Sequence, residues 1–135
     1  NRRDSVLTTF GPHDIVSDGY KLIESDVRDS AIIANKLGAM EVNASLPTLV
    51  LTECLLIYMR ADDTQSVLNW TVDYFGSQGD LAFVNYEMIN PDDQFGRMMV
   101  ENLENRGCQL LGIHDCPSTE SQMQRMRDLI ANKQG

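Results

Sequence analysis

The stretch Thr48-Leu-Val-Leu-Thr-Glu-Cys-Leu-Leu-Ile-Tyr58 decides the fold of this 135-residue chain. It follows Pro47 and is almost continuously apolar, which is typical of a central parallel strand that is covered on both faces. Its length predicts that the strand ends near Thr52 and that a functional turn begins at Glu53. A second run, Leu81-Ala-Phe-Val-Asn85, is equally apolar and predicts a second buried strand.

Segments with helical spacing alternate with short apolar runs, and this order is typical of an α/β layer structure. Two further short strands are predicted at Tyr20–Glu24 and Cys108–Ile113. Such alternation favours right-handed crossovers and a doubly wound, mostly parallel sheet. Two helices are expected from about Ser30 to Leu37 and from a cap at Asp62 or Asp63 to Phe75. A third is expected to open at Asn90-Pro91-Asp92 and to stop at Gly107, and its predicted inner face consists of Phe95, Met98, Met99, Asn102 and Leu103. The last is expected from Ser118 to Ala131, with a capping box of Thr119 and Gln122.

Composition and charge exclude several classes of protein. With 42% hydrophobic and 23% charged residues, the chain has the composition of a single globular domain. The net charge is −9 and no basic stripe is present, so phosphates repel the chain and nucleic-acid binding is disfavoured. No apolar run approaches the ~20 residues that span a bilayer, so a membrane protein is not expected.

The cysteines indicate the compartment. Cys54, Cys108 and Cys116 cannot all pair within one chain, which predicts a reduced, cytoplasmic protein. A zinc site of Cys108, His114 and Cys116 is disfavoured, because structural zinc sites usually need four closely spaced ligands and these residues flank a predicted buried strand. We therefore expect no metal, and we interpret His13 and His114 as structural or surface residues.

Polar groups follow three of the predicted strands. They lie at Ser25-Asp26-Val27-Arg28, from Thr52-Glu53-Cys54 through Tyr58, and at Asn85-Tyr86-Glu87. Because ligands of such sheets bind at the carboxyl ends of the strands, we expect these three segments to line one crevice. The alternative is that each acid only caps the helix after it.

The first of these edges favours a nucleoside pocket. The carboxylate of Asp26 can accept from an adenine amine, and the backbone N–H of Val27 can donate to a ring nitrogen. Arg28 is expected to pair with Asp26 or Asp29 and not with the ligand. No GxGxxG or GxxxxGK[ST] loop is present, which disfavours phosphate binding. An adenosine without phosphates, such as S-adenosylmethionine with its cationic sulfonium, fits this acidic setting better than NAD or ATP.

Several segments also resemble one known family. The run Pro47-Thr-Leu-Val-Leu-Thr-Glu-Cys-Leu-Leu-Ile-Tyr-Met59 is similar to the P-T-L-x-x-x-E-C-x-L-x-Y-M segment of leucine carboxyl methyltransferases. These enzymes methylate the C-terminal leucine carboxylate of type-2A protein phosphatase catalytic subunits. The similarity covers roughly Tyr20 to Met126 and includes, in the family's order, Ser25-Asp26-Val27-Arg28-Asp29, Phe83-Val-Asn-Tyr-Glu87, Phe95-Gly96 and Glu101-Asn-Leu103.

The resemblance implies a class I, S-adenosylmethionine-dependent methyltransferase with a Rossmann-like, mostly parallel sheet. By position, Asp26 and Val27 match the family's adenine-contacting pair, with Val27 where the family more usually has Leu. Glu53 matches its acid in the cofactor site. Tyr58 lies in the segment that borders the methyl-acceptor pocket, so we expect it to act in catalysis and in substrate binding. Tyr86 and the residue after it are further candidates for the substrate pocket.

The family's glycine-rich loop, its ribose-binding acid and its substrate-gripping arginine precede the point where this sequence begins, and its closing strands follow the last residue. We therefore expect residues 1–135 to be the central part of a larger catalytic domain, a remnant of three or four strands that is inactive alone. Two alternatives remain. One is a carboxyl methyltransferase that acts on a modified transfer-RNA base, and the other is a non-catalytic interaction fragment.

The expected reaction needs no general base. A C-terminal carboxyl group is already ionised at neutral pH, so methyl transfer depends on alignment of the carboxylate oxygen and on water exclusion. Cys54 is not expected to be a nucleophile, because the neighbouring acid Glu53 raises the pKa of its thiol.

Overall fold

The computed structural model describes residues 11–131, which fall into two compact units within residues 1–44 and 45–135. The first unit contains strands β1 (Ile15–Ser17) and β2 (Tyr20–Leu22) and helix α1 (Ser30–Ala39). The strand predicted at 20–24 is confirmed over three residues, but β2 pairs antiparallel with β1 in a hairpin and joins no parallel sheet. Helix α1 starts where it was predicted, because Asp29 accepts from the backbone N–H of Ile32 at 3.1 Å.

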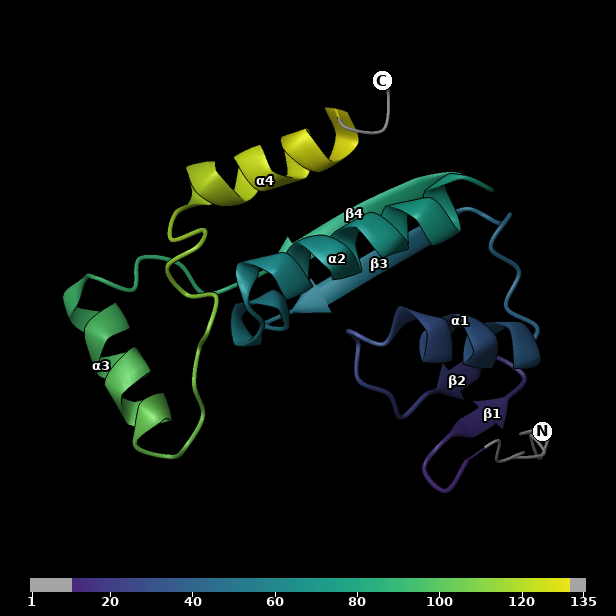
Figure 1. The fold of residues 1–135 in the computed structure, drawn as a ribbon, viewed down its shortest axis with the longest axis horizontal. Coiled ribbons are helices and arrows are strands. Elements are labelled where there is room, and N and C mark those ends of the chain that lie inside the picture. The colour runs from purple at the N-terminus through teal and green to yellow at the C-terminus, as the bar shows by residue number, and fades with distance from the viewer. Residues whose placement is uncertain (1–10, 132–135) are drawn as a thin grey trace, which may run out of the picture. The chain divides into compact units, whose positions relative to one another are not determined.

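The second unit is built on a parallel pair of strands joined by a helix (Figure 1). Strands β3 and β4 pair in register from Thr48 opposite Leu81 to Glu53 opposite Tyr86, which confirms both predicted strands and their parallel direction. The elements of this unit, in chain order, are β3 (Thr48–Glu53), a 3₁₀ turn η1 (Leu56–Tyr58), α2 (Ala61–Thr71), a π-helical turn η2 (Val72–Gly76), β4 (Leu81–Tyr86), α3 (Gln94–Glu104) and α4 (Thr119–Ala131).

Two predicted helix caps are wrong. Helix α2 begins at Ala61, so Asp62 and Asp63 lie in its first turn, where the helix dipole favours negative charge, and do not cap it. At the start of α4 the reciprocal bonds join Ser118 and Ser121, whose hydroxyls accept from each other's backbone N–H at 3.2 and 3.0 Å. Serines three residues apart satisfy this geometry without Thr119 or Gln122.

The side chain of Gln122 instead ties α4 to the sheet. Its Oε1 accepts from Nδ2 of Asn85 on β4 at 3.1 Å, and its Nε2 donates to the carbonyl of Cys116 at 3.0 Å. The Oδ1 of Asn85 in turn accepts from the hydroxyl of the buried Thr52 on β3 at 2.7 Å. This chain of hydrogen bonds joins both strands to α4 on one face of the sheet.

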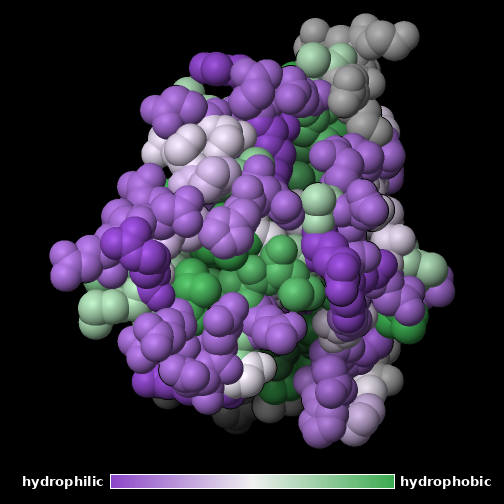
Figure 2. All heavy atoms as spheres, turned by 60° about the vertical axis from the view of Figure 1, so that its left-hand side comes forward, coloured by the Kyte–Doolittle hydropathy of each residue, from purple (hydrophilic) through white to green (hydrophobic). Residues whose placement is uncertain are grey.

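The other face of the β3–β4 pair is open within this unit. Leu49, Leu51 and Val84 point away from α2 and α4, and their exposed fractions are 66%, 62% and 46%. The expectation that the central strand is covered on both faces is therefore wrong here, because both helices pack on the side of Thr52 and Phe83. Figure 2 shows, for one side of the molecule, hydrophobic surface ringed by hydrophilic residues.

The strand predicted at Cys108–Ile113 is also wrong, since this segment forms turns. Its apolar residues are nevertheless buried, as predicted, because Leu110 and Ile113 pack with Ile57 in one cluster. The backbone N–H of Gly112 donates to the carbonyl of Ile57 at 2.9 Å. The described residues thus contain one parallel strand pair and one hairpin, and not the expected remnant of three or four strands in one sheet.

The predicted inner face of α3 is confirmed for Met99 and Leu103 and wrong for its other three residues. Phe95, Met98 and Asn102, which were expected inside, are exposed. Gly96 is the residue that approaches the preceding turn, where a Cβ would lie 2.2 Å from the carbonyl oxygen of Asn90. This close approach places positions at helical spacing from Gly96 on the inner face, where they pack against the Ile57 cluster: Met99, Val100 and Leu103. No helix within residues 11–131 has the length and apolar character to cross a membrane.

The substitution Gly112→Ala tests how the 54–59 turn is held by the loop after α3. A Cβ at this position would lie 2.7 Å from the carbonyl oxygen of Met59, and neither backbone can yield without loss of the bond to Ile57. We expect the free energy of unfolding, measured by urea denaturation, to fall by about 1–3 kcal/mol, the usual cost of overpacking. Gly38→Ala on α1, where nothing lies within 4 Å, is the control and should not lower stability. Equal stability of both variants would contradict the packing described here.

Candidate functional site

The carboxyl ends of β3 and β4 carry two of the predicted site residues. Glu53 and Tyr86 form the last register pair of the two strands, and both are exposed on the open face. Tyr86 exposes 65% of its surface. The structure therefore confirms that the polar segments after these two strands meet at one edge, as parallel pairing requires.

The turn after β3 is held by the end of β4. Cys54 has a φ of +44°, and its backbone N–H donates to the carbonyl of Tyr86 at 2.7 Å. The next two backbone N–H groups, of Leu55 and Leu56, both donate to Oε1 of Glu87 at 3.1 and 2.8 Å. The sequence marked Glu87 only as a candidate pocket residue, and its contact with the turn is a finding of the structure.

Tyr58 ends the 3₁₀ turn η1 and exposes 38% of its surface. Partial burial is the main cause that raises the pKa of its hydroxyl, and the thiol of Cys108 and the charge of Glu87 add to the increase. A raised pKa keeps the phenol protonated at neutral pH. Tyr58 can therefore donate a hydrogen bond to an anion.

The cysteine in the same turn is not activated. Burial raises the pKa of the Cys54 thiol, and the nearby charges of Glu87 and Glu53 raise it further, so the thiol stays protonated. This agrees with the expectation that Cys54 is no nucleophile. Within residues 11–131 all three cysteines are free, and no group of three or more His, Cys, Asp or Glu residues is placed to hold a metal ion.

Asp26 and Val27 belong to the first unit, in the loop between β2 and α1. Asp26 forms the predicted ion pair with Arg28, at 2.6 Å between Oδ2 and a guanidinium nitrogen, and it also accepts from the backbone N–H of Arg28 at 3.0 Å. These bonds lower the pKa of Asp26 to about 2. Among the described residues, no hydrogen bond uses the N–H of Val27, so this donor is available to a ligand.

A buried ion pair, which no sequence pattern predicted, supports the start of this loop. Asp14 is 1% exposed, and Nζ of Lys36 on α1 lies 2.9 Å from its Oδ2. The other oxygen of Asp14 accepts from the backbone N–H of Glu24 at 2.7 Å, and Lys36 also donates to the carbonyl of Glu24 at 2.7 Å. The bond from Lys36 is the main cause that lowers the pKa of Asp14. The strand end before Asp26 is thus fixed to α1.

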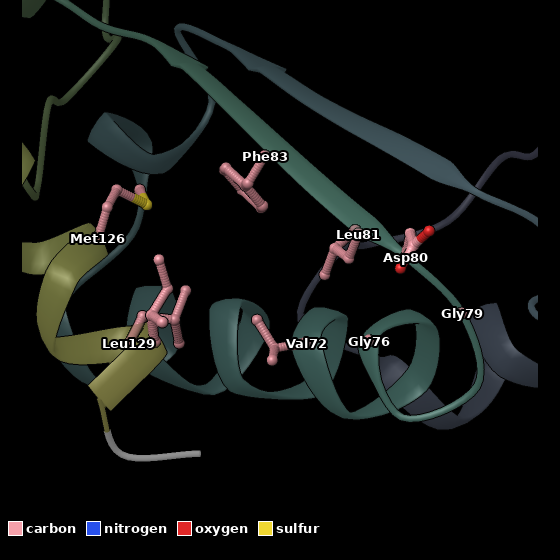
Figure 3. A pocket seen from close by; sticks show the side chains of 9 residues that line it. Val72, Gly76, Gly79, Asp80, Leu81, Phe83, Met126 and Leu129 are labelled. Carbon is pink, nitrogen blue, oxygen red and sulfur yellow. The ribbon is translucent and has the colours of Figure 1, made fainter. Parts of the chain in front are cut away.

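A cavity of about 370 Å³ lies at the opposite, amino end of β4 (Figure 3). Side chains from β4, α4 and η2 project into it, among them Leu81, Phe83, Val72 and Leu129. Asp80 is the one ionisable residue among those that line it. An almost wholly apolar lining offers little for catalysis, so the polar carboxyl edge remains the candidate site.

Comparison with known proteins identifies the relatives of this chain. No protein-family model matches it. It is 40% identical over 114 residues to leucine carboxyl methyltransferase 1 of Rattus norvegicus, covering 84% of this chain and 33% of the relative. It is 39% identical over 104 residues to an Arabidopsis thaliana homologue, covering 77% of this chain and 30% of the relative. It is 36% identical over 115 residues to the Caenorhabditis elegans protein, covering 85% of this chain and 34% of the relative. The chain spans about a third of the length of these curated relatives. Over that third, it is a homologue of the leucine carboxyl methyltransferases.

Proposed function

We propose that this chain is part of an enzyme that uses S-adenosylmethionine to methylate the C-terminal leucine α-carboxylate of a type-2A protein phosphatase catalytic subunit. The observation that carries the proposal is the meeting of Glu53 and Tyr86 at one carboxyl edge of a parallel strand pair, with Tyr58 in the turn that follows Glu53, in a homologue of leucine carboxyl methyltransferases. We also propose that the β3–β4 pair is part of a larger class I, Rossmann-like sheet and that the enzyme acts in the cytoplasm.

The residues present fit an adenosine cofactor without phosphates. Asp26 is ionised, and its Oδ1 already accepts from the backbone N–H and from Nε of Arg28, at 3.0 and 2.9 Å. Its Oδ2 accepts from a guanidinium nitrogen at 2.6 Å and has only a longer, shared contact with Nε at 3.2 Å, so Oδ2 is the oxygen that can accept from an adenine amine. The unused N–H of Val27 supplies the adjacent donor. Glu53 and Glu87 place negative charge around the turn, which favours a cationic sulfonium over a phosphate group.

In this reaction the residues of this chain orient the acceptor carboxylate, and none of them needs to abstract a proton. The cofactor supplies an electrophilic methyl group. In the transfer that the cofactor would supply, a lone pair of the carboxylate oxygen would form the new O–CH₃ bond, and the electron pair of the broken S–CH₃ bond would stay on sulfur. Tyr58, protonated at neutral pH, can donate to the other carboxylate oxygen and hold the attacking one in line. Because the acceptor is anionic and this edge is acidic, we propose that a cation from elsewhere in the protein pairs with it.

A comparison of acceptors tests the reaction. We expect the complete protein to methylate a phosphatase subunit that ends in a free leucine carboxylate. It should not methylate the same subunit when the tail ends in an amide, because the amide lacks both the charge and the nucleophilic oxygen. Tyr58→Phe should slow the reaction by about 10-fold or more, as expected for one lost transition-state hydrogen bond. Tyr20→Phe in the exposed hairpin is the matched control and should keep full activity. The measurement is transfer of a labelled methyl group.

The outcomes of this assay separate the alternatives. Equal labelling of the acid and the amide would contradict a carboxylate acceptor. Labelling of bulk transfer RNA alone would support the transfer-RNA enzyme instead. Binding of the cofactor with no transfer to any of these acceptors would favour a non-catalytic interaction protein.

Cofactor affinity tests the role of Asp26. Asp26→Ala should weaken S-adenosylmethionine by about 10-fold or more, because an adenine amine loses its acceptor. Since the pKa of Asp26 is about 2, the carboxylate loses its charge only as the pH falls through about 2, and it stays ionised at neutral and mildly acidic pH. The ratio of the two dissociation constants, measured by calorimetry, should therefore stay constant from pH 8 to pH 5. Asp18→Ala in the hairpin is the control, and an Asp26→Ala affinity within twofold of the wild type would contradict the assignment.

A further inference from the structure

The turn from Cys54 to Leu56 has the geometry of an anion-binding nest that is already filled from within the chain. Cys54 is left-handed at a φ of +44° and Leu55 is right-handed at a φ of −106°, and this alternation turns successive backbone N–H groups toward one point. The N–H groups of Leu55 and Leu56 converge on a single oxygen, Oε1 of Glu87. The anion in this nest is therefore a side chain from the end of β4.

The contact joins the two segments on which the proposed site depends. Glu53 immediately precedes the nest, and Tyr58 follows it in the same 3₁₀ turn, where its backbone N–H donates to the carbonyl of Leu55 at 3.2 Å. Glu87 directly follows Tyr86, which is the register partner of Glu53. One carboxylate thus sets the path of the chain between Glu53, the proposed cofactor acid, and Tyr58, the proposed hydrogen-bond donor to the acceptor carboxylate.

The second oxygen of this carboxylate indicates more than a packing role. Oε2 of Glu87 is buried and has no hydrogen-bond partner among the described residues. A glutamine would still offer an oxygen to both N–H groups and would avoid a buried, unpaired charged oxygen. The full charge strengthens the two bonds that Oε1 accepts, because hydrogen bonds to an ionised acceptor are stronger than those to a neutral one.

We propose that Glu87 is a positioning residue for the methyl transfer: its carboxylate binds the nest of residues 54–56 and thereby sets the orientation of Glu53 and Tyr58 toward each other. It acts through the turn and touches neither reactant. The inference rests on the proposed function, since it names the group that orients the residues assigned to that reaction. It predicts that loss of Glu87 impairs alignment in the transition state more than it impairs binding of the acceptor.

The test compares Glu87→Ala and Glu87→Gln in the complete protein, with Glu104→Ala at the exposed end of α3 as the control. Per folded molecule, Glu87→Ala should lower kcat by about 10-fold or more while the KM for the phosphatase tail changes by less than about threefold. Glu87→Gln should recover most of kcat, because its amide oxygen can accept from both N–H groups. A merely structural residue would change the folded fraction and leave kcat per folded molecule unchanged.

A second readout does not depend on the reaction. Amide hydrogen exchange at Leu55 and Leu56 should be slow in the wild type, faster by about 10-fold or more in Glu87→Ala, and intermediate in Glu87→Gln. Full kcat in a folded Glu87→Ala variant of an active enzyme, or unchanged exchange at both amides, would overturn the positioning role and leave the proposed function intact. A wild type that methylates no carboxylate, with the exchange pattern as expected, would instead overturn the proposed function and leave the contact as an element of the fold.

Discussion

The hydrogen bonding between β3 and β4 continues past the ends of the strands, and the candidate site depends on this continuation. The register ends at Glu53 and Tyr86, but Cys54 still donates to the carbonyl of Tyr86, and Glu87 accepts from the next two backbone N–H groups. Without these bonds a chain that leaves a two-stranded sheet could take many paths. With them, the turn begins in a left-handed residue, Cys54, and continues directly into the 3₁₀ turn that ends at Tyr58.

The parts that sequence analysis predicted correctly depend on local signals and on simple topology. The apolar runs at 48–52 and 81–85 are bounded by Pro47 and by the glycines before Asp80, so both strands could be predicted from a few neighbouring residues. The helix between them makes a parallel pair the natural result. Parallel pairing then brings Glu53 and Tyr86 together without knowledge of any side-chain contact. The pairing of Asp26 with Arg28, two residues apart, is local in the same way.

The failures arise where burial or bonding is decided by distant residues. The run at 108–113 is apolar because Leu110 and Ile113 pack against Ile57, and burial of this kind needs no strand. The face of α3 is set by the contact of Gly96 with the turn before it, which an apolar count around Phe95 cannot detect. The bonds from the turn to Glu87 span 31 and 32 residues, so no local pattern predicts them. An acid directly after a strand was the one signal available.

The most direct measurement for this account is a crystal structure of the complete protein with bound S-adenosylhomocysteine, the cofactor after methyl transfer. The account predicts that its sulfur lies at the carboxyl edge of β3 and β4, beside Glu53 and Tyr58, with the adenine on Asp26 and Val27 and with Glu87 still bound to the turn. A ligand in the apolar cavity lined by Leu81, Phe83 and Leu129, or one without contact to Glu53 and Asp26, would contradict it.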